Sequence, residues 1–178
     1  TYAVSFRDQP IVVDSGLGLT LRAAGAFTKG FRVVATHRAS HDERYTLVAG
    51  KTRNVRARCE EMTVTLEQEA NPSKKLEVVF RAYDDGVAFR YVLPRQKAIN
   101  LNYVELVSEE TQFRFGGDHR AWATFLPSFT SNNEEEFLPV PLLAIRPESI
   151  VGPPLVIELD KGVTVALAEA NLRKYSGL

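Results

Sequence analysis

The sequence predicts an all-β fold built from antiparallel sheets. Short runs rich in β-branched and aromatic residues recur along the whole chain, and Gly, Pro and Asp separate them. Long windows with apolar residues at helical spacing are rare. A dozen short strands in one chain favour two packed sheets that face each other. With 178 residues, the chain is long enough for one ordinary domain, and we predict a single domain over residues 1–178.

The expected strands follow one another with no visible repeat and no linker rich in Pro, Gly or Ser. They are residues 2–6, 11–13, 17–21, 31–38, 44–48, 55–66, 76–83, 87–93, 103–115, 142–145, 155–159 and 163–168. Gly152-Pro153-Pro154 is a rigid connector before the last two strands. Residues 132–136 form a polar loop.

Two of the connections have the chemistry of hairpin turns. Asp84-Asp85-Gly86 lies between the runs 76–83 and 87–93. A glycine in such a turn can adopt a positive φ without a side-chain clash, and Asp tolerates this conformation. Lys161-Gly162 repeats the device between the last two strands. Both hairpins are therefore expected.

The strand over residues 55–66 changes its apolar pattern halfway. Val55 and Cys59 occupy odd positions, whereas Met62 and Leu66 occupy even ones. Because side chains alternate between faces, the change predicts a β-bulge or a bend near Glu60-Glu61. Cys59 is then a small buried hydrophobic residue rather than a nucleophile.

Composition excludes several classes of function. The 22 basic residues balance 22 acidic ones, so the chain lacks the positive excess typical of binding to nucleic acid or to an anionic membrane. A hydrophobic content of 44% and a charged content of 25% are those of a globular protein and argue against disorder or a membrane span. A single cysteine allows neither an intrachain disulfide nor a multi-cysteine zinc site.

Short motifs that resemble catalytic signatures have simpler explanations. Ser40-His41-Asp42 holds the residue types of a hydrolase triad, but adjacent side chains on an extended chain point to opposite sides, so we expect a solvated turn. His37 and His41 would lie about 13 Å apart on a strand, too far to share one metal ion. Asp84-Asp85 belongs to the hairpin turn, and Gly16-Leu17-Gly18 lacks the rest of a dinucleotide-binding fingerprint.

Two further groups of residues could contact a ligand. Trp122, Phe125 and Phe129 lie near the polar loop and could stack on a sugar, although core packing is the commoner role of aromatic residues. Glu134-Glu135-Glu136 is typical of a solvated loop. Glu169 differs, because it continues the parity of Val163, Val165 and Leu167 as the last strand ends. A carboxylate at the end of an apolar face favours a cation or a hydrogen-bond partner, and either a structural or a ligand role is open.

Three blocks of residues follow one another in a distinctive order: residues 80–91, residues 117–122, and residues 168–172 with Tyr175 and Gly177. Their order and spacing resemble the amino-terminal domain of glycoside hydrolase family 97, from about Gly16 to the end. Family members are bacterial α-glucosidases and α-galactosidases, typically exported to the periplasm. No leader precedes Thr1 in this sequence, where a signal could have been removed.

The resemblance implies a β-super-sandwich of the galactose-mutarotase type, followed by a (β/α)₈ catalytic barrel and a small β domain. In such enzymes the catalytic carboxylates lie in the barrel. The sequence stops at Leu178, where the barrel is expected to begin. We therefore expect no catalytic residue in this chain and no hydrolysis by the chain alone.

The resemblance also implies a calcium ion, held by carboxylates of the barrel and by one glutamate of the amino-terminal domain. Glu169 matches that glutamate. Calcium takes about six to eight oxygen ligands, so the isolated chain should bind it weakly. Substrate contacts are implied for Asn171, His119 and Trp122. The sequence departs from the family at Asn171, where Ala or Asp is usual, and in residues 132–141, where Glu-Glu-Glu-Phe replaces a Tyr-Glu element.

Two functions remain open. The first is a noncatalytic domain of an exo-acting α-glycosidase that packs on its own barrel and contributes Glu169 and loops to the pocket for an α-linked oligosaccharide. The second is a self-sufficient sugar-binding module, or a mutarotase-like enzyme on the same fold. A mutarotase needs a paired acid and base, and none of the three histidines has an evident pairing. The choice between glucose and galactose depends on residues outside this sequence.

Overall fold

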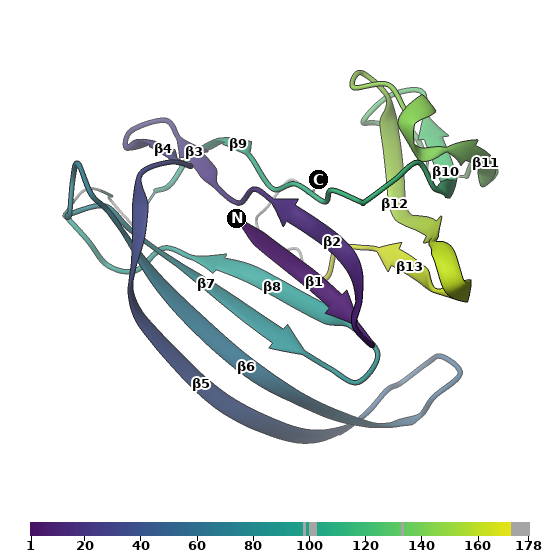
Figure 1. Ribbon diagram of the computed structural model, residues 1–178, viewed down its shortest axis with the longest axis horizontal. Coiled ribbons are helices and arrows are strands. Elements are labelled where there is room, and N and C mark those ends of the chain that lie inside the picture. The colour runs from purple at the N-terminus through teal and green to yellow at the C-terminus, as the bar shows by residue number, and fades with distance from the viewer. Residues whose placement is uncertain (98, 100–102, 133, 172–178) are drawn as a thin grey trace. The chain divides into compact units, whose positions relative to one another are not determined.

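The structure is a computed structural model that describes residues 1–97, 99, 103–132 and 134–171. These residues form thirteen β-strands and two short 3-10 helices, which confirms the all-β prediction (Figure 1). No helix within these ranges is long and apolar enough to cross a membrane. The strands are β1 (Tyr2–Phe6), β2 (Gln9–Ser15), β3 (Leu19–Leu21), β4 (Gly25–Phe27), β5 (Phe31–Thr46), β6 (Asn54–Gln68), β7 (Lys75–Ala82), β8 (Val87–Val92), β9 (Leu106–Glu109), β10 (Arg120–Leu126), β11 (Leu138–Pro141), β12 (Ile150–Glu158) and β13 (Thr164–Leu167).

The described strands form four sheets, and the pairing is antiparallel throughout the three larger ones. The chain divides into two compact units. The first comprises residues 1–2 and 15–112, and the second comprises residues 3–14 and 113–178. The sheets β4-β3-β9 and β5-β6-β7-β8 belong to the first unit, and the sheet β11-β10-β12-β13 belongs to the second. The single domain expected over residues 1–178 stays a prediction.

The core of the first unit joins its small sheet to β7. Its buried residues are Leu19, Leu21, Phe27, Leu76 and Ile99. Gly18 precedes β3 at a close approach, because a Cβ there would lie 2.8 Å from the carbonyl oxygen of Phe27. Glycine is thus required at this position for β3 and β4 to pack.

The strand β5 corrects two expectations at once. Residues 31–38 and 44–46, predicted to lie in two separate strands, belong to one strand of 16 residues, and the expected strand over residues 44–48 ends early, at Thr46. Ser40-His41-Asp42 is therefore no turn: these residues pair with Glu60, Cys59 and Arg58 of β6. The backbone groups of this polar segment are satisfied by the ladder, which the apolar pattern of β5 alone does not reveal.

The bulge expected near Glu60-Glu61 is also absent, because β5 and β6 pair without a shift from Ala35↔Thr65 to Thr46↔Asn54. The register shift of this pair lies instead between Val33 and Ala35. The change in apolar parity has another cause. β7 pairs with β6 only from Glu60 onward, so the neighbours that bury β6 change at this level. Cys59 is 7% exposed, in agreement with a buried hydrophobic role.

Both predicted hairpins are present. The β7–β8 hairpin closes through a hydrogen bond from Tyr83 N to Gly86 O at 2.8 Å. Gly86 does not adopt a positive φ, so the conformational role expected for this glycine is wrong. The four-residue loop between Ala82 and Val87 closes without a residue in the left-handed region. In the β12–β13 hairpin, Lys161 and Gly162 do adopt positive φ values of 58° and 74°.

Other strand boundaries differ from the prediction. Of residues 103–115 only Leu106–Glu109 forms a strand, and the expected strand over residues 142–145 is a 3-10 helix, η1 (Leu142–Ala144). Leu142 N donates to the carbonyl oxygen of His119 at 2.8 Å, which ends the ladder that β11 makes with β10. The strands β4, β10 and β11 were not expected. A second 3-10 turn, η2 (Asp160–Gly162), lies in the β12–β13 connection.

The sheet of the second unit has one closed face. Ala121, Ala123 and Ile157 are 0% exposed. Ala121 pairs with Ile157, which pairs in turn with Val165 of β13. Directly paired residues point to the same side of a sheet, so the side chains of Ala121, Ile157 and Val165 share the buried face. This face and its opposite position the candidate site residues.

Candidate functional site

Glu169 follows β13 on the side of the buried face. Val163, Val165, Leu167 and Glu169 are all half-buried, whereas the residues between them are exposed. The alternation continues two residues past the end of β13 at Leu167. The exposure of Glu169 agrees with the parity expected from the sequence, and its role as a ligand stays a prediction.

The opposite face of the same sheet presents a polar group around Trp122. Trp122 pairs with Val156 and not with a residue of the buried face. Its Nε1 donates to Glu158 Oε1 at 2.8 Å, and the other carboxylate oxygen of Glu158 lies 3.8 Å from Nη1 of Arg120. Glu158 thus fixes the indole ring while it neutralises Arg120.

A shallow hollow of about 620 Å³ adjoins this group. It is lined by Asp118, His119, Arg120 and Trp122 from β10 and its approach, and by Pro139, Val140 and Pro141 from β11. Asp118 Oδ1 accepts a hydrogen bond from Leu143 N at 3.0 Å, which holds the approach to β10 against η1. An aromatic ring beside planar charged groups is suited to bind a sugar, because the ring contacts C–H groups and the polar groups bind hydroxyls.

The structure brings some predicted residues together and separates others. His119 and Trp122 line one hollow. Glu169 is not among the residues that line this hollow, and it follows the end of β13 at Leu167. Asn171 is exposed with a φ of 57°, in the left-handed region that Asn tolerates. Leu172, Tyr175 and Gly177, also quoted for the resemblance, lie outside the described residues.

Sequence reasoning missed two residues: Arg120, which lines the hollow, and Glu158, which accepts the hydrogen bond from Trp122. The available signal was weak: Arg120 and Trp122 share a parity, but β10 itself was not expected. Glu158 becomes relevant only through the pairing of β10 with β12, which joins positions 36 residues apart. Phe129 is 88% exposed but is not among the residues that line the hollow.

Two ionic groups lie on opposite faces of the β5–β6 ribbon. On one face, Arg56 binds Asp42 through Nε at 2.8 Å and Nη2 at 2.5 Å. On the other, Arg81 Nε donates to Glu61 Oε2 at 2.7 Å, and His41 Nε2 lies 3.5 Å from the same oxygen. The hydrogen bond from Arg81 lowers the pKa of Glu61 below its ordinary value, and the charges of Arg81 and His41 add to the effect.

Comparisons with known proteins agree on one family. The model described as "Glycosyl-hydrolase 97 N-terminal" matches residues 1–178. A retaining alpha-galactosidase of Bacteroides thetaiotaomicron is 24% identical over 187 residues, which cover 100% of this chain and 27% of that protein. A probable retaining alpha-galactosidase of Streptomyces bingchenggensis is 28% identical over 177 residues, which cover 99% of this chain and 26% of that protein.

Solved structures agree with this assignment. A glycoside hydrolase family 97 enzyme from Pseudoalteromonas sp. strain K8, in complex with acarbose, matches with a TM-score of 0.80 and 26% identity, over 93% of this chain and 24% of that one. A beta-arabinopyranosidase matches with a TM-score of 0.81 and 26% identity, over 96% of this chain and 28% of that one. The predicted class, an all-β antiparallel sandwich, is confirmed by this likeness.

The chain belongs to the glycosyl-hydrolase 97 N-terminal family. It spans about a quarter of the length of the curated relatives that it matches.

Proposed function

We propose that this chain is the noncatalytic amino-terminal domain of an exo-acting α-glycosidase. The family model covers the whole chain. The two curated relatives named above are described as a retaining and a probable retaining alpha-galactosidase, which favours α-galactosidase over α-glucosidase and retention over inversion. We assign no catalytic carboxylate to the described residues. The reaction is carried out by the rest of the enzyme, for which the resemblance implies a (β/α)₈ barrel. An exported, periplasmic location is part of the same proposal.

The position of Glu169 carries the proposal that this domain contributes to a calcium site. A carboxylate oxygen is a ligand type that calcium prefers, and calcium needs about six to eight oxygen atoms. Within the described ranges, no group of three His, Cys, Asp or Glu side chains is arranged to hold a metal. The donor set therefore fits one ligand of a shared site, with the remaining ligands supplied by the barrel. Bound calcium would supply positive charge to hold and polarise oxygen atoms of the substrate.

Glu169→Gln in the full-length enzyme tests this role, because the substitution keeps the size of the side chain and removes its charge. We expect the calcium concentration for half-maximal activity to rise at least about tenfold, with activity partly recovered at high calcium. The melting temperature without calcium should stay close to that of the wild type. The measurement is activity against calcium concentration, beside melting curves in chelator.

Glu148→Gln is the matched control, because the Glu148 side chain is 71% exposed and lies 4.0 Å from Arg146. It should leave the calcium midpoint unchanged. If Glu169→Gln instead lowers the melting temperature without calcium and keeps the calcium midpoint, Glu169 is a structural partner and the metal assignment is wrong.

The hollow beside Trp122 supports a second part of the proposal, contact with the α-linked oligosaccharide. Trp122 would stack on a sugar ring, while His119 would bind its hydroxyls. Asn171 is assigned a contact of its own, because it follows the Glu169 segment and is exposed. We expect Trp122→Ala to weaken binding of α-galactosyl oligosaccharides by the full-length enzyme at least about tenfold, which calorimetry or NMR titration measures. Trp122→Phe keeps a ring and should retain most of the affinity.

Titration of the isolated 178-residue chain with the same oligosaccharides separates the two classes of function. A domain that works only with its barrel should bind free oligosaccharide weakly and hydrolyse no aryl α-galactoside. A self-sufficient sugar-binding module should bind it in the micromolar range without further chain. Sustained turnover by the pure chain would contradict both and favour a mutarotase-like or hydrolytic enzyme on this fold.

A further inference from the structure

The distal part of the β5–β6 ribbon extends without a third strand. β6 pairs with β7 only from Glu60 onward, whereas β5 and β6 stay paired as far as Thr46↔Asn54. Figure 1 shows this ribbon running past the turn that joins β7 and β8. We call residues 42–58 the arm. None of them is buried. A two-stranded ribbon is only marginally stable in water, so a surface that binds the arm would stabilise it.

The arm has a surplus of positive charge in a chain that is neutral as a whole. The arm contains five cationic side chains, Arg44, Lys51, Arg53, Arg56 and Arg58, and two acidic ones, Asp42 and Glu43. Asp42 pairs directly with Arg58, and Arg44 pairs with Arg56, so these four side chains share one face. The hydrogen bond from Arg56, with the charges of Arg58 and Arg44, lowers the pKa of Asp42. Three guanidinium groups thus surround one carboxylate and can bind further anions.

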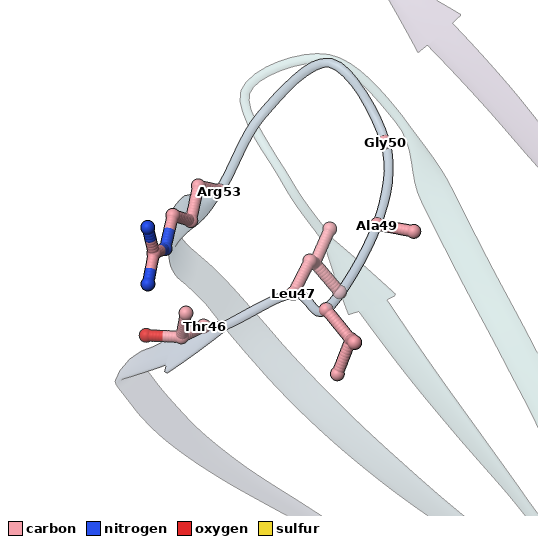
Figure 2. Close-up of a pocket in the computed structure, with 6 residues that line it drawn as sticks. Thr46, Leu47, Ala49, Gly50 and Arg53 are labelled. Atoms are coloured by element: carbon pink, nitrogen blue, oxygen red, sulfur yellow. The ribbon is translucent and has the colours of Figure 1, made fainter.

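The end of the arm is apolar. Tyr45, Leu47 and Val48 are 48%, 41% and 106% exposed. Figure 2 shows Leu47 and Ala49 on the loop between the strands, with Arg53 where the chain returns into β6. The loop surrounds an open hollow of about 420 Å³. A partner that offers carboxylates next to apolar side chains would therefore match the arm.

The second unit has a surface with this chemistry. Glu134, Glu135 and Glu136 are consecutive and exposed, and they are followed by Phe137 and Leu138, which are 47% and 46% exposed. We call residues 134–138 the acidic segment. Within this segment, Glu134 accepts a hydrogen bond at Oε2 from Asn132 Nδ2 at 3.1 Å. Its charge and apolar content match those of the arm.

We propose that the arm of one copy of this chain binds the acidic segment of a second copy. Each copy carries one arm and one acidic segment, so a two-fold dimer contains the same contact twice. Arg44 and Arg58 bind the carboxylates of Glu135 and Glu136, since the guanidinium fork matches a carboxylate. The apolar tip of the arm is covered by Phe137 and Leu138. This inference goes beyond the proposed function and does not depend on it.

Sedimentation velocity of the 178-residue chain at micromolar concentration and low salt tests the proposal. We expect a dimer that dissociates as the salt concentration rises. R44E/R58E keeps the Asp42–Arg56 pair, and E135K/E136K keeps the Asn132–Glu134 contact. Each double variant alone should raise the dimer dissociation constant at least about tenfold. An equimolar mixture of the two should form a heterodimer. In it, the acidic arm of R44E/R58E meets the basic segment of E135K/E136K, and the basic arm of the second variant meets the acidic segment of the first.

K29E/R146E is the control, because it changes the net charge equally at exposed positions outside both surfaces. It should leave the dimer dissociation constant unchanged.

Three results would overturn the proposal: a monomeric wild-type chain, a dimer whose dissociation constant is the same in both double variants, or a mixture that stays monomeric. Co-sedimentation of a monomeric chain with phosphatidylserine vesicles would assign the arm to an anionic membrane instead. A monomer whose melting temperature falls in both double variants and recovers in the quadruple variant would assign the contact to a single chain.

Discussion

The two four-stranded sheets bury their side chains to different degrees along their length. In β11-β10-β12-β13, Ala121, Ala123 and Ile157 are completely enclosed. In β5-β6-β7-β8, Leu76 and Val78 of β7 are buried at 2% and 1% exposure, whereas no residue of the arm is buried. Both sheets have residues that alternate between faces. The alternation of side chains along a strand therefore determines which face a residue occupies. Burial of that face also requires neighbouring strands and a second layer that covers it.

The largest expected effect is at the centre of the enclosed face. Ile157→Ala removes atoms that have no contact with solvent, so we expect the free energy of unfolding to fall by about 2–5 kcal/mol. Val55→Ala removes a half-buried side chain from the arm and should cost less than about 1 kcal/mol. Denaturant titrations of both variants measure the contrast. If both variants lose the same free energy of unfolding, the side chains of the arm are buried as completely as those of the β11-β10-β12-β13 sheet.

Ala121→Leu tests the same face by adding atoms. Ala121 is 0% exposed and lies directly opposite Ile157, so the larger side chain has no room and should destabilise the chain by about 1–3 kcal/mol. Ala166→Leu is the control on the opposite face, where Ala166 is exposed. It should change stability by less than about 0.5 kcal/mol. A tolerated Ala121→Leu would mean that the enclosed face contains a void.

A smaller effect, dependent on pH, is expected at Glu61, next to the arm. Arg81 lowers the folded-state pKa of Glu61 below its ordinary value of 4.5. A carboxylate with a depressed pKa stabilises the fold above its ordinary pKa, and this contribution is lost as the pH falls through the depressed value. Glu61→Gln should therefore lower the melting temperature at pH 7, and the gap to the wild type should narrow progressively as the pH falls below 4.5. A gap of constant size across this range would rule out the charge as its cause.

The smallest effect is expected at the exposed pair of the arm. The Arg56 and Asp42 side chains are 50% and 45% exposed, and such pairs contribute little because water and salt screen them. Arg56→Gln should leave the melting temperature of the monomeric chain in 0.5 M salt (high enough to screen the pair) unchanged within error. A clear fall under these conditions would show that the arm depends on this pair for its pairing.

Local chemistry allowed part of the fold to be predicted. The β7–β8 and β12–β13 hairpins could be recognised because each turn lies within a few residues of the strands that it joins. The face of Glu169 could be predicted because alternation past Leu167 is a property of one strand. The group around Trp122 could not be completed in the same way, because Glu158 reaches it only through the pairing of β10 with β12.

The sequence by itself determined the all-β class, the two hairpins and the apolar parity that ends at Glu169, since these depend on φ preferences and on a period of two. Only the tertiary structure decided that β5 continues through Ser40-His41-Asp42 and that the burial of β6 changes at Glu60. It also decided that Trp122 lies beside Glu158, on the face opposite to that of Ala121 and Ile157. These features depend on which strands pair across long sequence separations, and the energy of such pairs comes from contacts that no single segment contains.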